Sequence, residues 1–213
     1  MKINEKLFSY FENAGRKISY KAREIIYMQE ENAESLFLVV KGRVRVYSIS
    51  PAGEEITLEI LEKGRIFGES SFFQNSLRPT TVEAVNDVEL ISCVIAELYR
   101  YFRESEELMT AVFRHLTRTC DHVTYLLKMS YLYDRYQKIA SFLLYQTKTD
   151  DVEKGIVNNT IPYTHEEVAA CLGLSRVTVT KVLREFSQKG YIENRYKKIR
   201  VIERNKLMEL MEK

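Results

Sequence analysis

Hydrophobic and polar residues alternate along short segments between residues 18 and 94. Ile56, Leu58 and Ile60, for example, are separated by polar residues, a pattern typical of half-buried antiparallel strands. Glycine-containing turns separate such segments, and so many short strands in so few residues predict a small antiparallel β-roll or barrel. The strands are predicted at residues 24–28, 36–40, 43–48, 55–61, 80–84 and 88–94.

The spacing of apolar residues changes to a helical period outside this region. Residues 1–17 form a short amphipathic helix by this pattern, and residues 95–133 are helical with a break near Glu104-Ser105. A helix of about 25 residues, about 38 Å long, exceeds what a small domain covers. We therefore predict a parallel dimer seam, the alternative being a helix that lies on the roll. The predicted stripe comprises Leu108, Val112, His115, Leu116, Thr119, Val123, Leu126, Leu127 and Ser130.

Capping signals divide the C-terminal part into further helices. Asp134 with Gln137 forms a capping box that begins a helix over 136–146, which makes 131–134 a hinge. A polar loop follows over 147–160. Thr164 with Glu167 is a second capping box, and a turn glycine leads to an N-cap serine. The second helix then extends to residue 189. The spacing is that of a helix-turn-helix, with the small Ala169 at the helix crossing, Gly173 in the turn and Val179 as a buried β-branched anchor.

The second of these helices has two distinct faces. Its apolar face comprises Val179, Val182, Leu183 and Phe186, whereas Arg176, Val177, Thr180, Lys181 and Arg184 form a stripe with three cations and no acid. Such a stripe fits a DNA major groove, the alternative being a solvated basic face. Residues 191–202 alternate as a hairpin with a basic tip over 194–198, which predicts a wing. The predicted DNA contacts are Thr164, Ser175, Arg176, Val177, Thr178, Thr180, Lys181, Arg184, Lys197 and Lys198.

Composition and charge agree with this division. The 213 residues are 45% hydrophobic and 29% charged, so we predict an α+β chain with a sensing roll over 1–104, a dimerisation helix over 105–133 and a winged helix-turn-helix domain over 134–213. Residues 176–200 hold eight bases and two acids, although the net charge of the chain is only +2. This basic tract predicts contact with phosphate. Without a long apolar run or signal peptide, we expect a cytoplasmic protein that does not contact membranes.

The residues suited to metal chemistry are few and scattered. Cys93, Cys120 and Cys171 lack the spacing of a zinc or iron–sulfur site. His115 and His122 share a helix face, which could suit haem or a metal, but packed or solvated histidines are the simpler interpretation. A roll without histidine also lacks the usual ligands of a metalloenzyme. We therefore predict neither catalytic residues nor a metal site.

Three features together resemble the cyclic-AMP receptor protein / fumarate-nitrate regulator (Crp/Fnr) family. These are Gly42 and Gly53 of the roll, the segment FGESSFFQNSLRPTTVEAV over 67–85, and LGLSRVTVTKVL in the helix-turn-helix. The resemblance implies a homodimeric bacterial transcription regulator that binds a palindrome and contacts RNA polymerase. The LSRVTVTKVL stretch is similar to halorespiration regulators, which bind A·T-rich sites. Much of the family has glutamate where this chain has Val177.

The segment over 67–85 resembles the phosphate-binding cassette of cyclic-nucleotide domains. In that cassette the glutamate corresponding to Glu69 holds the ribose, and the arginine corresponding to Arg78 pairs with the phosphate. Pro79 departs from the pattern because it lacks the N–H that its family counterpart donates. We therefore expect a small-molecule effector other than cyclic AMP, such as an apolar or aromatic acid. The candidate effector contacts are Gly68, Glu69, Ser70, Arg78, Pro79, Thr80, Thr124, Tyr125 and Lys128.

Two alternatives remain open from the sequence. Glu69 and Arg78 could form a purely structural ion pair inside the roll. The chain could also be a cyclic-nucleotide-binding regulatory protein that acts through protein partners, although such a protein would not need the basic recognition stripe. Our preferred hypothesis is a two-state regulator, in which an effector changes the hinge over 131–134 and thereby the spacing of two recognition helices.

Overall fold

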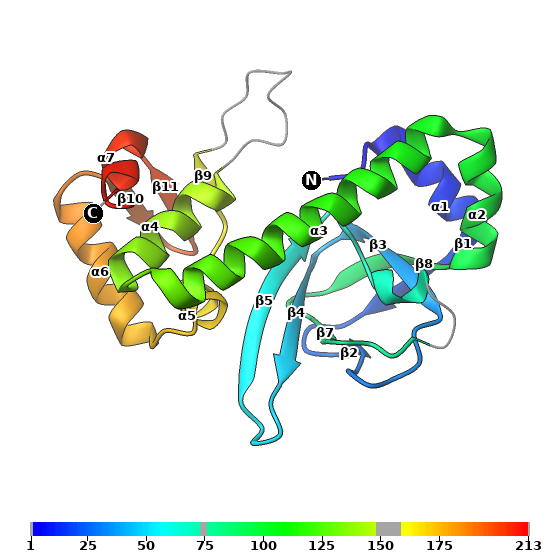
Figure 1. The fold of residues 1–213 in the computed structure, drawn as a ribbon, viewed down its shortest axis with the longest axis horizontal. Coiled ribbons are helices and arrows are strands. Elements are labelled where there is room, and N and C mark those ends of the chain that lie inside the picture. The colour runs from blue at the N-terminus through cyan, green and yellow to red at the C-terminus, as the bar shows by residue number, and fades with distance from the viewer. Residues whose placement is uncertain (1, 73–75, 148–158, 213) are drawn as a thin grey trace. The chain divides into compact units, whose positions relative to one another are not determined.

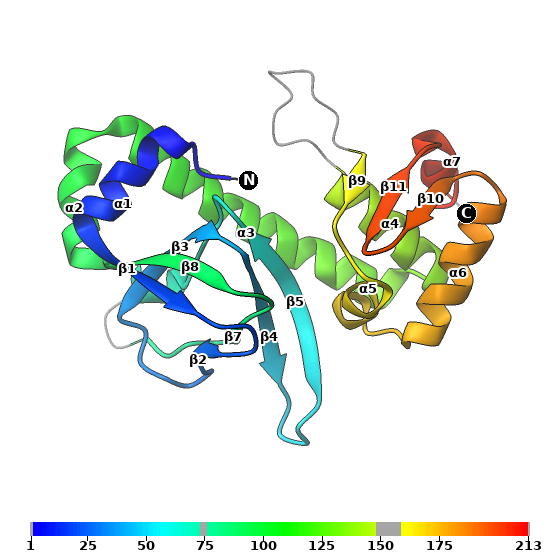
Figure 2. The same cartoon turned by 180° about the vertical axis from the view of Figure 1, so that it is seen from behind.

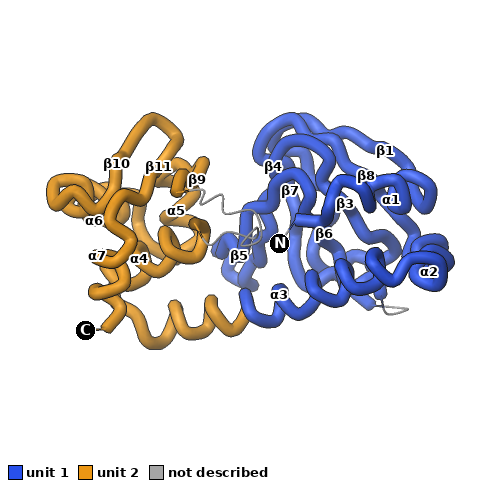
Figure 3. Tube along the Cα trace, turned by 90° about the horizontal axis from the view of Figure 1, so that it is seen from above, with its two compact units in different colours: residues 1–122 blue, residues 123–213 orange. Residues whose placement is uncertain are grey.

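The computed structural model describes residues 2–72, 76–147 and 159–212. The chain forms two compact units, Met1–His122 and Val123–Lys213 (Figure 3). The boundary falls inside one long helix, α3 (Glu106–Leu132). Most of the loop predicted over 147–160 lies outside the described residues.

The first unit is built on two four-stranded antiparallel sheets. Their strand orders are β1-β8-β3-β6 and β2-β7-β4-β5, and the sheets face one another in both views of the fold (Figures 1 and 2). The fold class predicted from the sequence is confirmed. The strands are β1 (Gly15–Tyr20), β2 (Ile25–Tyr27), β3 (Ser35–Lys41), β4 (Arg43–Ile49), β5 (Glu55–Glu62), β6 (Ile66–Phe67), β7 (Thr81–Ala84) and β8 (Val88–Val94).

The alternation of side chains along β3 gives the first unit two cores. Phe37 and Val39 pack between the two sheets. Leu36 and Leu38 point to the other face, where they join the cluster beneath the helices. All four side chains are buried because the strand has apolar neighbours on both of its faces. The helical elements of this unit are η1 (Glu5–Leu7), α1 (Phe8–Ala14), η2 (Glu69–Phe72), α2 (Ile95–Glu104) and the first part of α3.

The second unit combines helices with a three-stranded sheet of order β10-β11-β9. Its buried residues include Ile139, Leu143, Val179 and Leu183. No helix in the described ranges is both long and apolar enough to cross a membrane. The elements are the end of α3, α4 (Arg135–Gln146), β9 (Thr160–Ile161), α5 (His165–Leu172), α6 (Arg176–Gln188), β10 (Ile192–Arg195), β11 (Lys198–Val201) and α7 (Arg204–Glu209).

Most predicted elements are present with small shifts of their ends. The break at Ser105 separates α2 from α3, and the capping box of Asp134 with Gln137 begins α4. The sequence missed β1, β6, β9 and α7. These elements are short or carry charged residues at exposed positions, so local apolar patterning gives little signal and the strands depend on pairing with distant partners.

The stripe predicted along α3 was wrong as a dimer seam in its first part, and in its second part it stays a prediction. Leu108 and Val112 are buried in the core of the first unit, so this part of the helix follows the alternative in which it lies on its own domain. Val123 and Leu127 of the stripe are instead 51% and 55% exposed, and Phe113, which the predicted stripe did not include, is 62% exposed. The two apolar faces are interleaved in sequence, and a heptad-like count does not separate them.

Candidate functional site

The turn between α5 and α6 is fixed by the caps that the sequence indicated. Thr164 Oγ1 accepts a hydrogen bond from the Glu167 N–H at 3.2 Å, while the Thr164 N–H donates to the Glu167 carboxylate at 2.7 Å. Gly173 ends α5 with φ of 60°, a left-handed conformation that suits glycine. Ser175 Oγ then accepts from the Thr178 N–H at 3.0 Å and begins α6.

The two faces of α6 separate as the sequence predicted. Val179, Val182, Leu183 and Phe186 are all buried. The opposite stripe of Arg176, Val177, Thr180, Lys181 and Arg184 is exposed throughout. Val177 is 79% exposed, so this apolar side chain has no packing role within its own unit. The outer face of α6 thus presents three cations with small side chains between them.

The wing is the hairpin of β10 and β11. Tyr196 at its tip is 87% exposed, and Lys197 adopts a positive φ of 54° in the turn. Lys197 and Lys198 are exposed, as predicted for phosphate contacts. Arg195 is different, because its guanidinium binds the Glu193 carboxylate at 2.7 Å. The basic tip predicted over 194–198 is therefore partly neutralised within the hairpin.

The sequence prediction missed two side chains at this surface. His165, the first residue of α5, contacts Thr180 of α6 through one ring nitrogen and Asn194 of β10 through the other. Glu166 lies 3.7 Å from Arg176 across the same turn. Local sequence patterns gave no signal for these contacts, because the partners are 15, 29 and 10 positions apart in the chain.

In the roll, Arg78 is held beneath the turn of the cassette-like segment. It is 4% exposed, and its guanidinium donates to the carbonyl oxygens of Gly68 at 2.9 Å and Ser35 at 2.6 Å. It also lies 4.3 Å from the ring centre of Tyr27. Burial lowers the pKa of Arg78 and raises that of Tyr27 to about 12. Glycine is favoured at position 68, since its φ is 89° and an added Cβ would lie 2.9 Å from the backbone carbonyl oxygen of Ser35.

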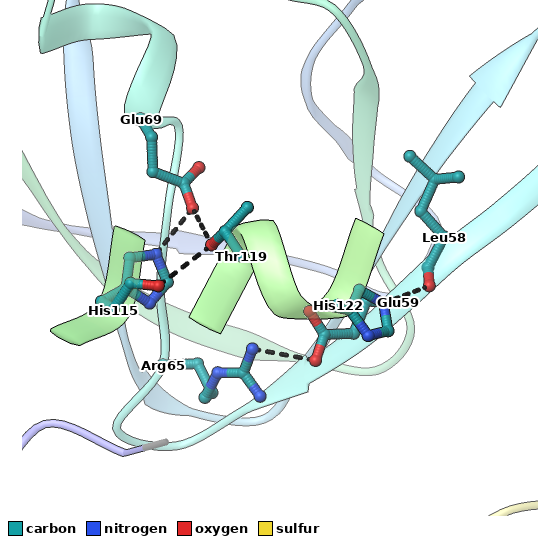
Figure 4. A network of polar contacts seen from close by, with 7 residues as sticks. All are labelled: Leu58, Glu59, Arg65, Glu69, His115, Thr119 and His122. Atoms are coloured by element: carbon teal, nitrogen blue, oxygen red, sulfur yellow. Dashed lines mark hydrogen bonds and ion pairs between the residues drawn. The ribbon is translucent and has the colours of Figure 1, made fainter. Parts of the chain in front are cut away.

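Glu69 is engaged by the first part of α3. His115 Nε2 lies 2.6 Å from the Glu69 carboxylate, and the Thr119 hydroxyl lies 3.3 Å from the same oxygen (Figure 4). Burial alone would raise the pKa of Glu69, but the hydrogen bond and charge of His115 outweigh it and lower that pKa. The contact joins η2 of the cassette-like segment to α3 within the first unit.

These contacts decide two alternatives that the sequence left open. Glu69 pairs with His115 rather than with Arg78, because Arg78 is occupied by backbone carbonyls. The histidines also point to different partners, since His122 donates to the Leu58 carbonyl at 3.0 Å (Figure 4). Among the described residues, no three His, Cys, Asp or Glu side chains gather as metal ligands.

The remaining candidate effector contacts are distributed between the two units. Ser70 lies 3.3 Å from the Arg78 guanidinium, Pro79 is exposed and Thr80 is half-buried. On α3, Thr124 and Lys128 are exposed and belong to the second unit with Tyr125. Tyr125 stacks on Tyr145 of α4, with ring centres 4.3 Å apart, and burial raises its pKa. Its ring thus packs on the helix-turn-helix unit.

The first unit is thus a roll with a nucleotide-cassette-like turn, and the second is a winged helix-turn-helix, the architecture of a DNA-binding domain. A family model of the cyclic nucleotide-binding domain matches residues 17–105, and one of the Crp-like helix-turn-helix domain matches residues 137–210. The chain belongs to the Crp/Fnr family of transcription regulators, as the sequence predicted. Members of this family are regulators rather than enzymes.

The similar proteins span nearly the whole chain. The global nitrogen regulator of a Nostoc species is 27% identical over 187 residues, covering 86% of this chain and 83% of the relative. A CRP-like cAMP-activated global transcriptional regulator of Mycobacterium tuberculosis is 25% identical over 195 residues, covering 89% and 85%. The crystal structure of a CRP/FNR family regulator from Thermus thermophilus is 27% identical with a TM-score of 0.67, covering 93% and 99%.

Proposed function

We propose that this protein is an effector-responsive transcription regulator that binds a palindromic, A·T-rich operator as a homodimer. The outer face of α6 carries the proposal. This face of the helix carries Arg176, Lys181 and Arg184 and no acid of its own, and it places the exposed Val177 and Thr180 among them. Arg176 has an acid of α5 nearby, Glu166 at 3.7 Å. The DNA phosphates attract the three cations, while the small side chains can approach base edges in the major groove. RNA polymerase is the protein partner that the family implies.

Support for the homodimer comes from a second face of α3. Along this face the side chains are uncharged and largely exposed, whereas charged residues lie to one side of it. Such a face buries its apolar groups when a second copy of the helix packs against it. The stripe comprises Phe113, Leu116, Thr117, Cys120, Val123, Thr124, Leu127 and Tyr131, and the neighbouring charged residues are Arg114, Arg118, Asp121 and Lys128.

Selection of binding sites from a random duplex library tests this function directly. We expect two A·T-rich half-sites related by two-fold symmetry, with centres about 34 Å or a multiple of that apart. Sedimentation of the complex should give two chains per duplex. Selection of an asymmetric site, or a complex with one chain, would contradict the homodimer. The absence of any enrichment would contradict sequence-specific binding altogether and favour action through protein partners.

The proposed effector site is the cassette-like turn around Glu69 and Arg78. In the structure, both of the groups that would bind a cyclic nucleotide already have protein partners, namely His115 and two backbone carbonyls. An anionic group of an effector at Arg78 must replace those carbonyls, and a hydroxyl group that donates to Glu69 must displace the His115 side chain. The exchange at Glu69 changes a contact of α3, the helix that bears the proposed dimer face. This coupling supports a two-state response.

Cyclic AMP at millimolar concentration should neither stabilise the protein nor change its DNA binding. Pro79 lacks one phosphate donor, and a lost hydrogen bond to a charged group costs about 1.5–3 kcal/mol. If this loss brings Kd into the millimolar range, millimolar cyclic AMP raises the free energy of unfolding by only about 0.4 kcal/mol. Calorimetric titration and thermal unfolding measure both quantities. Pro79→Ser, which restores the N–H, should bind more tightly than the wild type, whereas a micromolar isotherm for the wild type would contradict the prediction.

A further inference from the structure

A single imidazole joins the three elements of the winged helix-turn-helix that face one another at the proposed DNA surface. His165 Nδ1 lies 3.0 Å from Thr180 Oγ1 of α6. Its Nε2 lies 2.9 Å and 3.2 Å from the two amide atoms of Asn194 in β10. Asn194 is paired with Ile199 in the wing hairpin. The contact therefore connects the start of α5, the recognition face of α6 and the wing.

The chemistry of the three groups makes this connection robust. A hydroxyl and a carboxamide can each donate or accept a hydrogen bond, so both ring nitrogens find a complementary partner in either neutral tautomer and in the protonated imidazolium. Unlike Asn194, the wing arginines make ion pairs within their own hairpin, where Arg195 and Arg200 both bind Glu193. Asn194 instead reaches across to α5. The bridge also restrains Thr180, whose hydroxyl in a helix otherwise divides between two rotamers.

We propose that His165 is a positioning residue for sequence readout. By holding Thr180 and Asn194, it presents the recognition face of α6 and the wing to DNA in one fixed arrangement. The inference rests on the proposed DNA-binding function and goes beyond it, because the role belongs to a residue outside the recognition stripe. His165 acts through its neighbours here, rather than by binding phosphate. The two roles differ in what they change when the side chain is removed.

Loss of a positioning residue should weaken specific binding and leave non-specific binding intact. We expect His165→Ala to lower the affinity for the selected duplex by about three- to tenfold, the value of one or two neutral hydrogen bonds. Its affinity for a random-sequence duplex and the dependence of binding on salt should stay those of the wild type. Lys198→Ala is the matched control, because loss of a phosphate contact weakens both duplexes alike and lowers the salt slope by about one. Fluorescence anisotropy at several salt concentrations measures all of these quantities.

Coupling between the bridge residues provides the second readout. The double variant His165→Ala/Asn194→Ala should bind the selected duplex no more weakly than the weaker single variant, because either change alone breaks the connection to the wing. His165→Gln places an amide near the position of Nε2 and should recover part of the loss. Thermal unfolding of each variant should show that the second unit remains folded.

Two patterns of lost affinity among the variants would overturn the positioning role. One is that His165→Ala behaves like Lys198→Ala, with equal losses on both duplexes and a lower salt slope, which would make His165 a phosphate contact. The other is that the losses of His165→Ala and Asn194→Ala add. Failure of the wild type to bind any selected duplex would instead refute the proposed function, and this inference with it. Normal binding by the wild type and by His165→Ala would refute the positioning role alone.

Discussion

An aspartate in place of Leu127 will make the protein monomeric and weaken its binding to the selected palindrome by about a hundredfold or more. Leu127 is 55% exposed and lies within the uncharged face of α3. A carboxylate there must lose its water when two helices meet, at a cost of several kcal/mol. A monomer then contacts one half-site at a time, and its affinity falls toward that of non-specific binding. Analytical ultracentrifugation and anisotropy measure the two effects.

Leu132→Asp provides a control with the same chemical change on the same helix. Leu132 is 70% exposed, but it lies about 140° further around the helix than Leu127, outside the uncharged face. We expect this variant to remain dimeric. The control concerns the oligomeric state alone, because Leu132 also lies in the predicted hinge over 131–134. A dimeric Leu127→Asp protein, or equal dissociation of both variants, would show that this face of α3 is not the dimer seam.

A glutamate in place of Val177 will change the base pair preferred at one step of the half-site. In much of the family a glutamate at this place accepts a hydrogen bond from cytosine N4 and requires a G·C pair. Valine accepts no hydrogen bond, and its 79% exposure leaves its methyl groups available to a thymine methyl. We expect the wild type to select T or A at that step. Val177→Glu should shift the preference toward G·C by about 1–3 kcal/mol.

The contribution of the valine itself is tested by Val177→Ala. This variant shortens the apolar side chain without supplying an acceptor, so it should weaken the preference for T without creating one for G·C. Parallel site selection with the three proteins measures the change. An invariant G·C pair in the wild-type site at that step would mean that Val177 does not read the base. The same conclusion follows if the glutamate variant selects an unchanged sequence.

The sequence by itself determined the elements whose signals are local. Thr164 with Glu167 and Asp134 with Gln137 lie three residues apart, so the capping boxes could be read directly from the chain. The same holds for the opposed faces of α6. In these elements the period of the backbone decides which side chains share a face. The family resemblance and the recognition stripe followed from such local patterns. The alternation predicted along β5 was wrong, because Ile56 is 51% exposed and Thr57 is buried where the pairing with β4 shifts register between Val46 and Tyr47.

Only the tertiary structure decided which polar groups meet. Glu69 binds His115 from 46 positions away, Arg78 binds the carbonyl of Ser35 from 43, and His165 meets Asn194 from 29. No period relates such residues, because their separation depends on how strands and helices pack. Packing likewise divided α3 into a buried face with Leu108 and Val112 and an exposed one with Phe113 and Leu127. Both faces are apolar, and composition does not tell which one the roll covers.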